Sequence, residues 1–144
     1  MTGSDLDRFV RAQDAGGTFD RALDELRSGR KQSHWMWFVF PQIAGLGSSA
    51  TARHYAIASL DEAVAYLRHP VLGDRLREAT ACVLDHDCRA ATDILGPVDA
   101  MKLRSSMTLF ARAGPDEPLF ALVLERFFGG VPDDRTGELL DRGR

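Results

Sequence analysis

The chain has 144 residues, with 18 basic and 21 acidic side chains and a formal net charge of −3. Hydrophobic residues make up 44% and charged residues 27%, which is typical of a folded domain and does not favour an intrinsically disordered chain. A charge balance this mild gives no indication of a nucleic-acid or membrane partner. We therefore expect one domain over residues 1–144.

The first helical pattern lies in residues 19–26. Apolar residues recur there at helical spacing, and they form one stripe along a helix. Thr18 fits the N-cap position and Gly29 fits the position just after the last turn. This pattern predicts a helix between these two residues.

The next segment, residues 35–40, is entirely apolar and too short for its periodicity to assign it to a structure. We interpret it as a buried helix that is capped by Ser33 and closed by Pro41, and a buried strand is the alternative. The loop at residues 45–49 contains two glycines and could expose amides to a phosphate, but it lacks the lysine of a P-loop. A turn in which Ser48 or Ser49 caps the next helix is the favoured interpretation.

Two helices are predicted on either side of Pro70. Ser59 and Glu62 form the pattern of a capping box, which predicts a helix that ends near His69. Pro70 suits the first turn of a following helix, whose apolar face continues to Val83.

The second half of the chain favours further helices. They are a short one from Asp87 to Gly96, a longer one from Pro97 to Gly114, one from about Glu117 to Phe128, and a short terminal one around Leu139 and Leu140. No convincing strand alternation is present. The sequence therefore predicts an all-α fold, a compact multi-helix bundle in a single domain.

The cysteines and the apolar runs bear on the compartment. Cys82 and Cys88 do not suggest a disulfide framework or a zinc site, and the N-terminus lacks a signal-peptide pattern. The longest apolar run is far shorter than a membrane span. We expect two free thiols, a cytoplasmic location, no metal and no cofactor.

Several long motifs resemble those of one family. They are His34–Ile43 followed by Gly45–Ser49, then Tyr55–Ile57, Tyr66–Gly73 and Met101–Phe110. On these motifs the chain is similar to domain-of-unknown-function family 1810, an uncharacterised bacterial and fungal family that is sometimes labelled calpastatin-like. The resemblance implies a compact, mostly helical fold, and it implies no reaction and no catalytic residue. The calpastatin label carries no weight, because such an inhibitor would be disordered and poor in aromatic residues.

The strongest candidate site surrounds the apolar run. Trp35 and Trp37 lie close in sequence to Lys31, His34 and Gln42. Aromatic rings with a few polar groups are the usual lining of a small-molecule pocket, where a tryptophan could stack on a ring and Lys31 could meet an anion. The simpler interpretation, which we favour for most of the aromatic residues, is that they fill the core.

A second candidate is the polar group Lys102, Ser105 and Ser106. On a helix these residues share one side, and they could form an anion clamp or a nucleophile with its base. The order Lys-x-x-Ser is the reverse of the Ser-x-x-Lys motif of penicillin-binding enzymes. A serine hydroxyl that returns its hydrogen bond to a helix carbonyl is the favoured alternative.

Three functions remain open. The first is a module that binds a small anionic, ring-bearing ligand of the nucleotide or nucleotide-sugar type. The second is an enzyme that acts on such a ligand through glycosidic-bond or ADP-ribose-type chemistry, with His34 or Lys102 in proton transfer or charge stabilisation. The third is a protein–protein adaptor. The predicted ligand-binding residues are Lys31, His34, Trp35, Trp37, Gln42, Lys102, Ser105 and Ser106. The sequence does not determine the oligomeric state.

Overall fold

The computed structural model describes residues 5–86 and 88–142. Its helices are α1 (Asp7–Asp14), the short 3-10 helix η1 (Ala15–Gly17), α2 (Thr18–Ser28), α3 (Met36–Val39), α4 (Ala50–His54), α5 (Leu60–Arg68), α6 (Leu72–Leu84), α7 (Ala91–Leu95), α8 (Pro97–Ala113), α9 (Leu119–Phe128) and α10 (Asp134–Arg142). The only extended pairing in this part of the chain is one parallel bridge between Ile43 and Ile57. The prediction of an all-α fold is confirmed.

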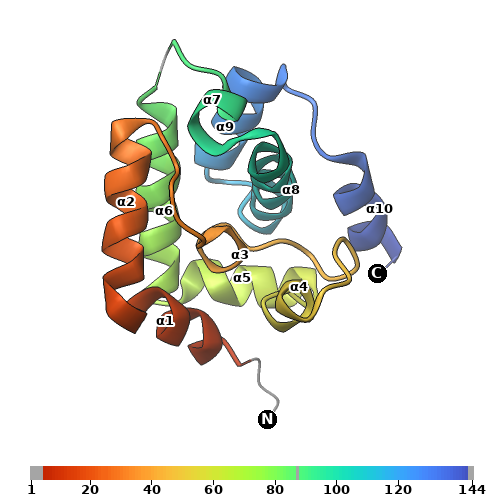
Figure 1. Ribbon diagram of the computed structural model, residues 1–144. Coiled ribbons are helices and arrows are strands. Elements are labelled where there is room, and N and C mark those ends of the chain that lie inside the picture. The colour runs from red at the N-terminus through yellow and green to blue at the C-terminus, as the bar shows by residue number, and fades with distance from the viewer. Residues whose placement is uncertain (1–4, 87, 143–144) are drawn as a thin grey trace.

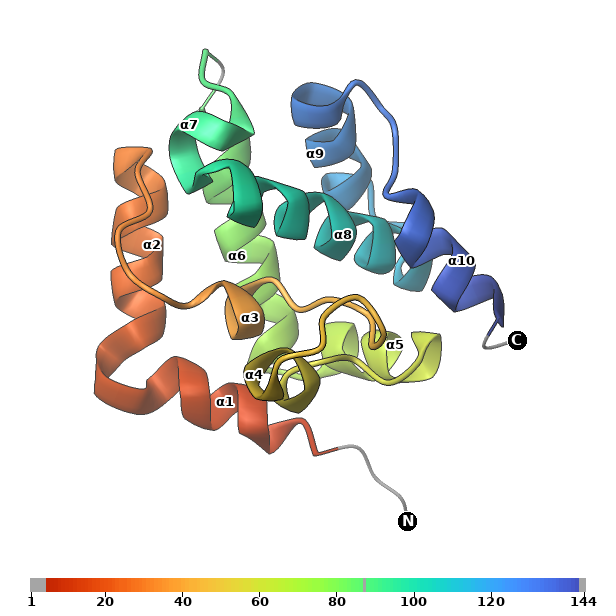
Figure 2. The same cartoon turned by 45° about the vertical axis from the view of Figure 1, so that its right-hand side comes forward.

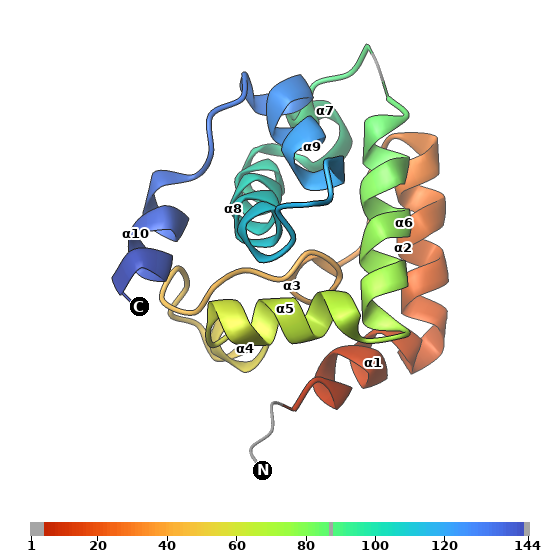
Figure 3. The same ribbon diagram turned by 180° about the vertical axis from the view of Figure 1, so that it is seen from behind.

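Helix α8 is central to the second half of the chain. It packs against α5, α7, α9 and α10, while α2 and α6 lie side by side at the other end of the molecule (Figure 1). Figure 2 shows α10 beside the C-terminal half of α8. The views from the front and from behind agree that the chain between α3 and α4 passes between α5 and α8 (Figure 3). This segment therefore brings its side chains close to α8.

A series of aromatic contacts connects four of the helices through the core. Phe9 of α1 meets Tyr66 of α5 edge to face, with the ring centroids 5.2 Å apart. Tyr66 lies 5.3 Å from Phe110 of α8, which lies 5.9 Å from Phe120 of α9. All four rings are fully buried, so they supply a large apolar area to the core.

The predicted helix at residues 19–26 is confirmed as α2, and its end is as expected. Gly29 follows the helix in the left-handed conformation, with φ of 79°, which glycine adopts without steric cost. The prediction of Thr18 as the N-cap is wrong. Gly17 occupies that position, and the Thr18 hydroxyl donates instead to the carbonyl of Ala15 at 2.6 Å.

The helices on either side of Pro70 are also confirmed. The hydroxyl of Ser59 accepts a hydrogen bond from the amide of Glu62 at 3.1 Å, as a helix cap does. The Glu62 carboxylate accepts from the amide of Ala58 at 2.8 Å, so the reciprocal half of the capping box is displaced by one residue. Helix α6 begins at Leu72, two residues later than predicted, because the chain turns through Pro70 first.

The predicted breaks in the second half of the chain are present. Pro97 opens α8 directly after Gly96, and Gly129 ends α9 with φ of 63°. Helix α9 begins at Leu119, two residues after the predicted start. Asp87, the predicted cap of the short helix α7, lies outside the described residues.

Two further features concern the cysteines and the apolar character of the helices. Cys82 is buried, Cys88 is exposed, and both are free thiols, as predicted. Among residues 5–86 and 88–142, no helix combines the length and the apolar character that crossing a bilayer requires.

Candidate functional site

The loop that follows α2 is held by Glu25. The carboxylate accepts hydrogen bonds from the amides of Gln32 and Ser33 at 2.8 and 3.0 Å, and from the Ser33 hydroxyl at 2.6 Å. It also accepts from the indole N–H of Trp35 at 2.8 Å. Burial raises the pKa of Glu25, but these hydrogen bonds favour the charged form and bring the pKa down to about 2. An ionised carboxylate therefore fixes the loop and the Trp35 ring.

Ser33 does not cap α3 as predicted. Its hydroxyl is engaged by Glu25, and α3 begins after Trp35 without a side-chain cap. The segment is a single helical turn, so the helical interpretation of residues 35–40 holds in its middle. This short turn points Trp35 into the core, where it is 1% exposed, and leaves Trp37 half-buried.

Asp99 joins the two candidate groups that the sequence separates. Its Oδ2 lies 2.9 Å from Nζ of Lys31, and its Oδ1 lies 3.1 Å from Nζ of Lys102. The side chain of Lys31 is 8% exposed and that of Lys102 is 20% exposed. One carboxylate therefore compensates two partly desolvated cations, and the three side chains together keep a positive charge.

Lys102 also lies over an aromatic ring. Its Nζ is 4.0 Å from the centroid of Trp37, within the range of a cation–π contact. This contact brings the one-turn helix α3 against the first turns of α8. Lys31 makes the corresponding contact with Trp35, at 5.0 Å, deeper in the structure.

A cavity of about 370 Å³ opens where these segments meet, a volume in the range of small-molecule sites. Four predicted residues lie on its wall: Trp37, Gln42, Lys102 and Ser105. The rest of the wall is formed by Leu46, Gly47, Val98, Met101, Asp133 and Arg135. We refer to this space as the α8 cavity.

The charged groups of the α8 cavity differ in how far they are already paired. The Asp133 carboxylate accepts hydrogen bonds from the amide and the hydroxyl of Thr136, at 2.9 and 2.6 Å, at the start of α10. Arg135 forms an exposed ion pair with Glu138 at 3.4 Å. Lys102 shares its carboxylate partner with Lys31, so it keeps positive charge for an incoming anion.

The other four predicted residues do not line this cavity. Lys31 is turned to Asp99 and to the carbonyl of Ser33, and Trp35 is buried against Glu25. His34 is exposed on the loop before α3. Ser106 is fully buried, and its Oγ has no hydrogen-bond partner within the described residues.

Ser105 combines both interpretations of the Lys102 group. Its hydroxyl donates to the carbonyl of Met101 at 3.2 Å, the return bond that the alternative predicted. It also lies on the wall of the α8 cavity. Val98 and Met101 were not predicted as site residues, although they precede Lys102 and Ser105 on one face at helical spacing.

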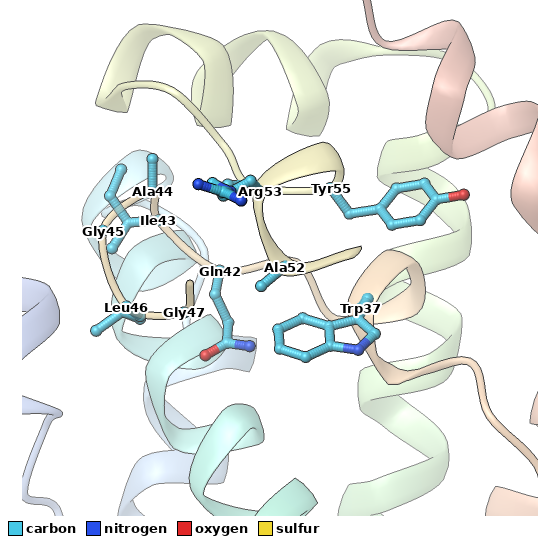
Figure 4. A pocket seen from close by; sticks show the side chains of 11 residues that line it. Trp37, Gln42, Ile43, Ala44, Gly45, Leu46, Gly47, Ala52, Arg53 and Tyr55 are labelled. Carbon is cyan, nitrogen blue, oxygen red and sulfur yellow. The ribbon is translucent and has the colours of Figure 1, made fainter. Parts of the chain in front are cut away.

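The glycine loop after α3 forms a second hollow of about 240 Å³ (Figure 4). The hydroxyl of Ser49 accepts from the amide of Ala52 at 3.1 Å, which confirms the predicted cap of the following helix. Two hydrogen bonds of 2.8 Å tie the loop to Ile57: one from the Ile57 amide to Gln42 and one from the Ala44 amide to Ile57. We refer to this space as the α4 hollow. Arg53 and Tyr55, which also line it, were not predicted.

Comparison with known proteins places the chain in a family. The sequence profile of a family described as a protein of unknown function (DUF1810) matches residues 3–140. The chain belongs to the DUF1810 family. The crystal structure of the conserved hypothetical protein Rv1873 from Mycobacterium tuberculosis is similar, with a TM-score of 0.92 and 51% sequence identity over 95% of this chain and 96% of that one. No curated protein matches the chain.

Membership of DUF1810 confirms the resemblance that the motifs indicated. Separately, the crystal structure of Rv1873 supports the helical fold, because it is similar along nearly its whole length. Neither comparison says what the protein does, and neither assigns a reaction to any residue of the α8 cavity. A function must therefore be argued from the geometry of the site itself.

Proposed function

We propose that the protein binds a small anionic, ring-bearing ligand, of the nucleotide or nucleotide-sugar type, in the α8 cavity. The observation that carries this proposal is the meeting of Trp37 and Lys102 on one cavity wall, with the ammonium 4.0 Å from the ring centroid. These residues come from distant parts of the sequence. Only the tertiary fold brings them to one space with Gln42 and Ser105.

The Lys102 ammonium has the donors that an anion needs. A lysine side chain carries three N–H groups, and Lys102 donates one hydrogen bond to Asp99, with Nζ 3.1 Å from Oδ1. The side-chain amide of Gln42 adds hydrogen-bonding groups that can fix the orientation of a ligand. These groups would hold an anionic or polar substituent on the ligand.

The apolar part of the wall suits a ring. Val98 and Met101 are 67% and 70% exposed, an unusual state for large apolar side chains that line a concave surface. A bound ring would cover them together with the accessible part of Trp37. The same exposure would suit an adaptor surface, so the test below separates the two.

We propose a cytoplasmic location, because a reducing compartment keeps cysteines such as Cys82 and Cys88 free.

The test compares two lysines that share one carboxylate. A panel of nucleotides and nucleotide sugars is screened by thermal shift on the native chain, where a binding member adds about 2.7 kcal/mol of stability at 100 times its Kd. Lys102→Met is expected to abolish the shift, because it removes the charge from the cavity wall. Lys31→Met leaves Asp99 to compensate Lys102 alone, so the shift is expected to become smaller, but it is expected to persist because Lys31 does not line the cavity.

Two results would contradict the proposal. A shift that survives Lys102→Met would remove Lys102 from the site. A panel that never moves the midpoint of native protein would favour the adaptor, with Val98 and Met101 at its interface.

A further inference from the structure

The α4 hollow and the α8 cavity share a wall. Both are lined by Trp37, Gln42, Leu46 and Gly47, so the two spaces lie next to each other. We infer that the ligand of the α8 cavity extends past Trp37 and carries a second anionic group, which is bound by Arg53 in the α4 hollow. This inference rests on the proposed function and names the class of ligand more closely.

Arg53 is the single charged side chain on the lining of the α4 hollow. The remaining lining is Trp37, Gln42, Ile43, Ala44, Gly45, Leu46, Gly47, Ala52, Tyr55 and Ala56, which contains no carboxylate. Because this lining is mostly apolar, an anion there would face the guanidinium with little competing charge. The hollow is thus electropositive through one residue.

Within the residues that the structure describes, the guanidinium of Arg53 forms no ion pair or hydrogen bond. Several other arginines have carboxylate partners; these are Arg8 with Glu62, Arg75 with Asp14, Arg77 with Glu117, and Arg112 with Asp141. A guanidinium that lines a hollow without a protein partner retains all its donors for a ligand.

The two cations lie on different sides of the shared wall. In Figure 4 the Arg53 side chain reaches toward Ala44 in the glycine loop, while the amide of Gln42 points away from it toward α8. Trp37 and Gln42 therefore stand between Arg53 and the space that Lys102 lines. A ligand that engages both cations needs anionic groups on two sides of its ring system.

Gly47 keeps the junction of the two spaces thin. A Cβ at this position would lie 2.7 Å from the Cβ of Ala52 and 3.7 Å from the Trp37 indole. The absence of a side chain therefore lets the glycine loop pack closely against α4 at the shared wall.

The class of ligand that follows is a ring-bearing molecule with two separated anionic groups. Adenosine 3′,5′-bisphosphate is a probe of this class, whereas ADP carries both phosphates at one end. AMP and adenosine complete the series with one anionic group and none. Calorimetric titration of these four compounds into native protein is expected to give the tightest binding for the bisphosphate, about tenfold tighter than for ADP.

Three variants assign the binding to the two cations. Arg53→Gln is expected to weaken the bisphosphate about tenfold and to leave AMP within about twofold, since a charge-assisted hydrogen bond of this size is lost. Lys102→Met is expected to weaken both compounds. Arg68→Gln is the matched control, because Arg68 is an exposed arginine that lines neither space.

Each alternative outcome has a separate meaning. Bisphosphate binding that depends on Lys102 but not on Arg53 overturns this inference and leaves the proposed function in place. Binding that depends on Arg53 but not on Lys102 keeps an anion site in the α4 hollow and removes the proposed site in the α8 cavity. If none of the four compounds binds native protein, this ligand class is wrong.

Discussion

The loop before Trp35 and the segment after it differ in how far their polar groups are already paired within the protein. Before Trp35, the polar groups are already paired: Glu25 receives four hydrogen bonds, and Lys31 is enclosed by Asp99 and the carbonyl of Ser33. After it, Trp37 borders two open spaces that are lined by Lys102 and Arg53. Proximity of lysine and tryptophan in sequence is therefore weak evidence for a ligand site. The degree to which the polar groups are already engaged is the better criterion.

The two tryptophans provide the largest test of this comparison. Trp35→Ala is expected to lower the free energy of unfolding by roughly 3–5 kcal/mol, because it empties a fully buried site and leaves the Glu25 carboxylate without its indole donor. Trp37→Ala is expected to cost roughly 1–2 kcal/mol, because its ring is only half-buried. Denaturant unfolding of both variants measures the difference. Equal losses would show that Trp37 is as structural as Trp35.

Glu25 offers a pH-dependent test of the loop before Trp35, whose polar groups are already paired. Its pKa is about 2 in the folded protein against an ordinary value of 4.5, so the unfolded chain binds the proton more readily. The stabilisation is therefore complete above about pH 4.5 and is lost as the pH falls toward 2. Glu25→Gln is expected to lower stability at pH 7 by roughly 1.5–3 kcal/mol and to flatten the decline in stability in that acidic window.

The measurement is denaturant unfolding at a series of pH values, with native protein and Glu25→Gln in parallel. Glu78→Gln is the control, because Glu78 has an exposed ion pair with Arg27 rather than a set of backbone donors. A Glu25→Gln curve that runs parallel to the native curve between pH 2 and about 4.5 would show that Glu25 is not the group that titrates.

The segment after Trp35 has its own packing constraint, which lies at Gly47. Gly47→Ala would place a methyl 2.7 Å from the Cβ of Ala52 and is expected to cost roughly 1–3 kcal/mol. Because the contact is with a single methyl group, Ala52→Gly in the same chain should recover part of the loss. A double variant that is no more stable than Gly47→Ala would place the strain elsewhere in the loop.

The sequence predicted those features that depend on neighbours in the chain. Gly29 ends α2 and Pro97 opens α8 because the backbone conformations of these residues act locally. Helix α1 was missed because its eight residues bury only Phe9 and Gln13, which leaves too few apolar positions for a periodic stripe. Local signals thus decide helix ends better than they reveal polar helices.

Only part of the candidate site could be predicted from the sequence, because most of its contacts join residues that are far apart in the chain. Lys102 and Trp37 stood out by residue type. Their contact depends on the fold, in which the segment from α3 to α4 runs past α8. Arg53 lies outside the motifs that the sequence singled out, and no carboxylate shares the lining of the α4 hollow with it, which only the structure shows. The pairing of Asp99 with Lys102 has helical i,i+3 spacing, but its pairing with Lys31 depends on the tertiary fold and could not be predicted from the sequence.

The smallest effects are expected at the two lysines, and they sharpen the comparison most directly. Lys31→Met removes a nearly buried ammonium that pairs with Asp99 at 2.9 Å and donates to the carbonyl of Ser33. It is expected to cost roughly 1–2 kcal/mol, since two enclosed contacts are lost. Lys102→Met leaves Asp99 paired with Lys31 and keeps an apolar stem against the Trp37 ring. Its cost is expected to stay below about 1 kcal/mol.

Denaturant unfolding of both variants in one buffer shows which of the two changes is the more destabilising. If Lys102→Met were the more destabilising change, the lysine on the cavity wall would be a structural residue. The loop before Trp35 and the segment after it would then not differ in how far their charged groups are already paired.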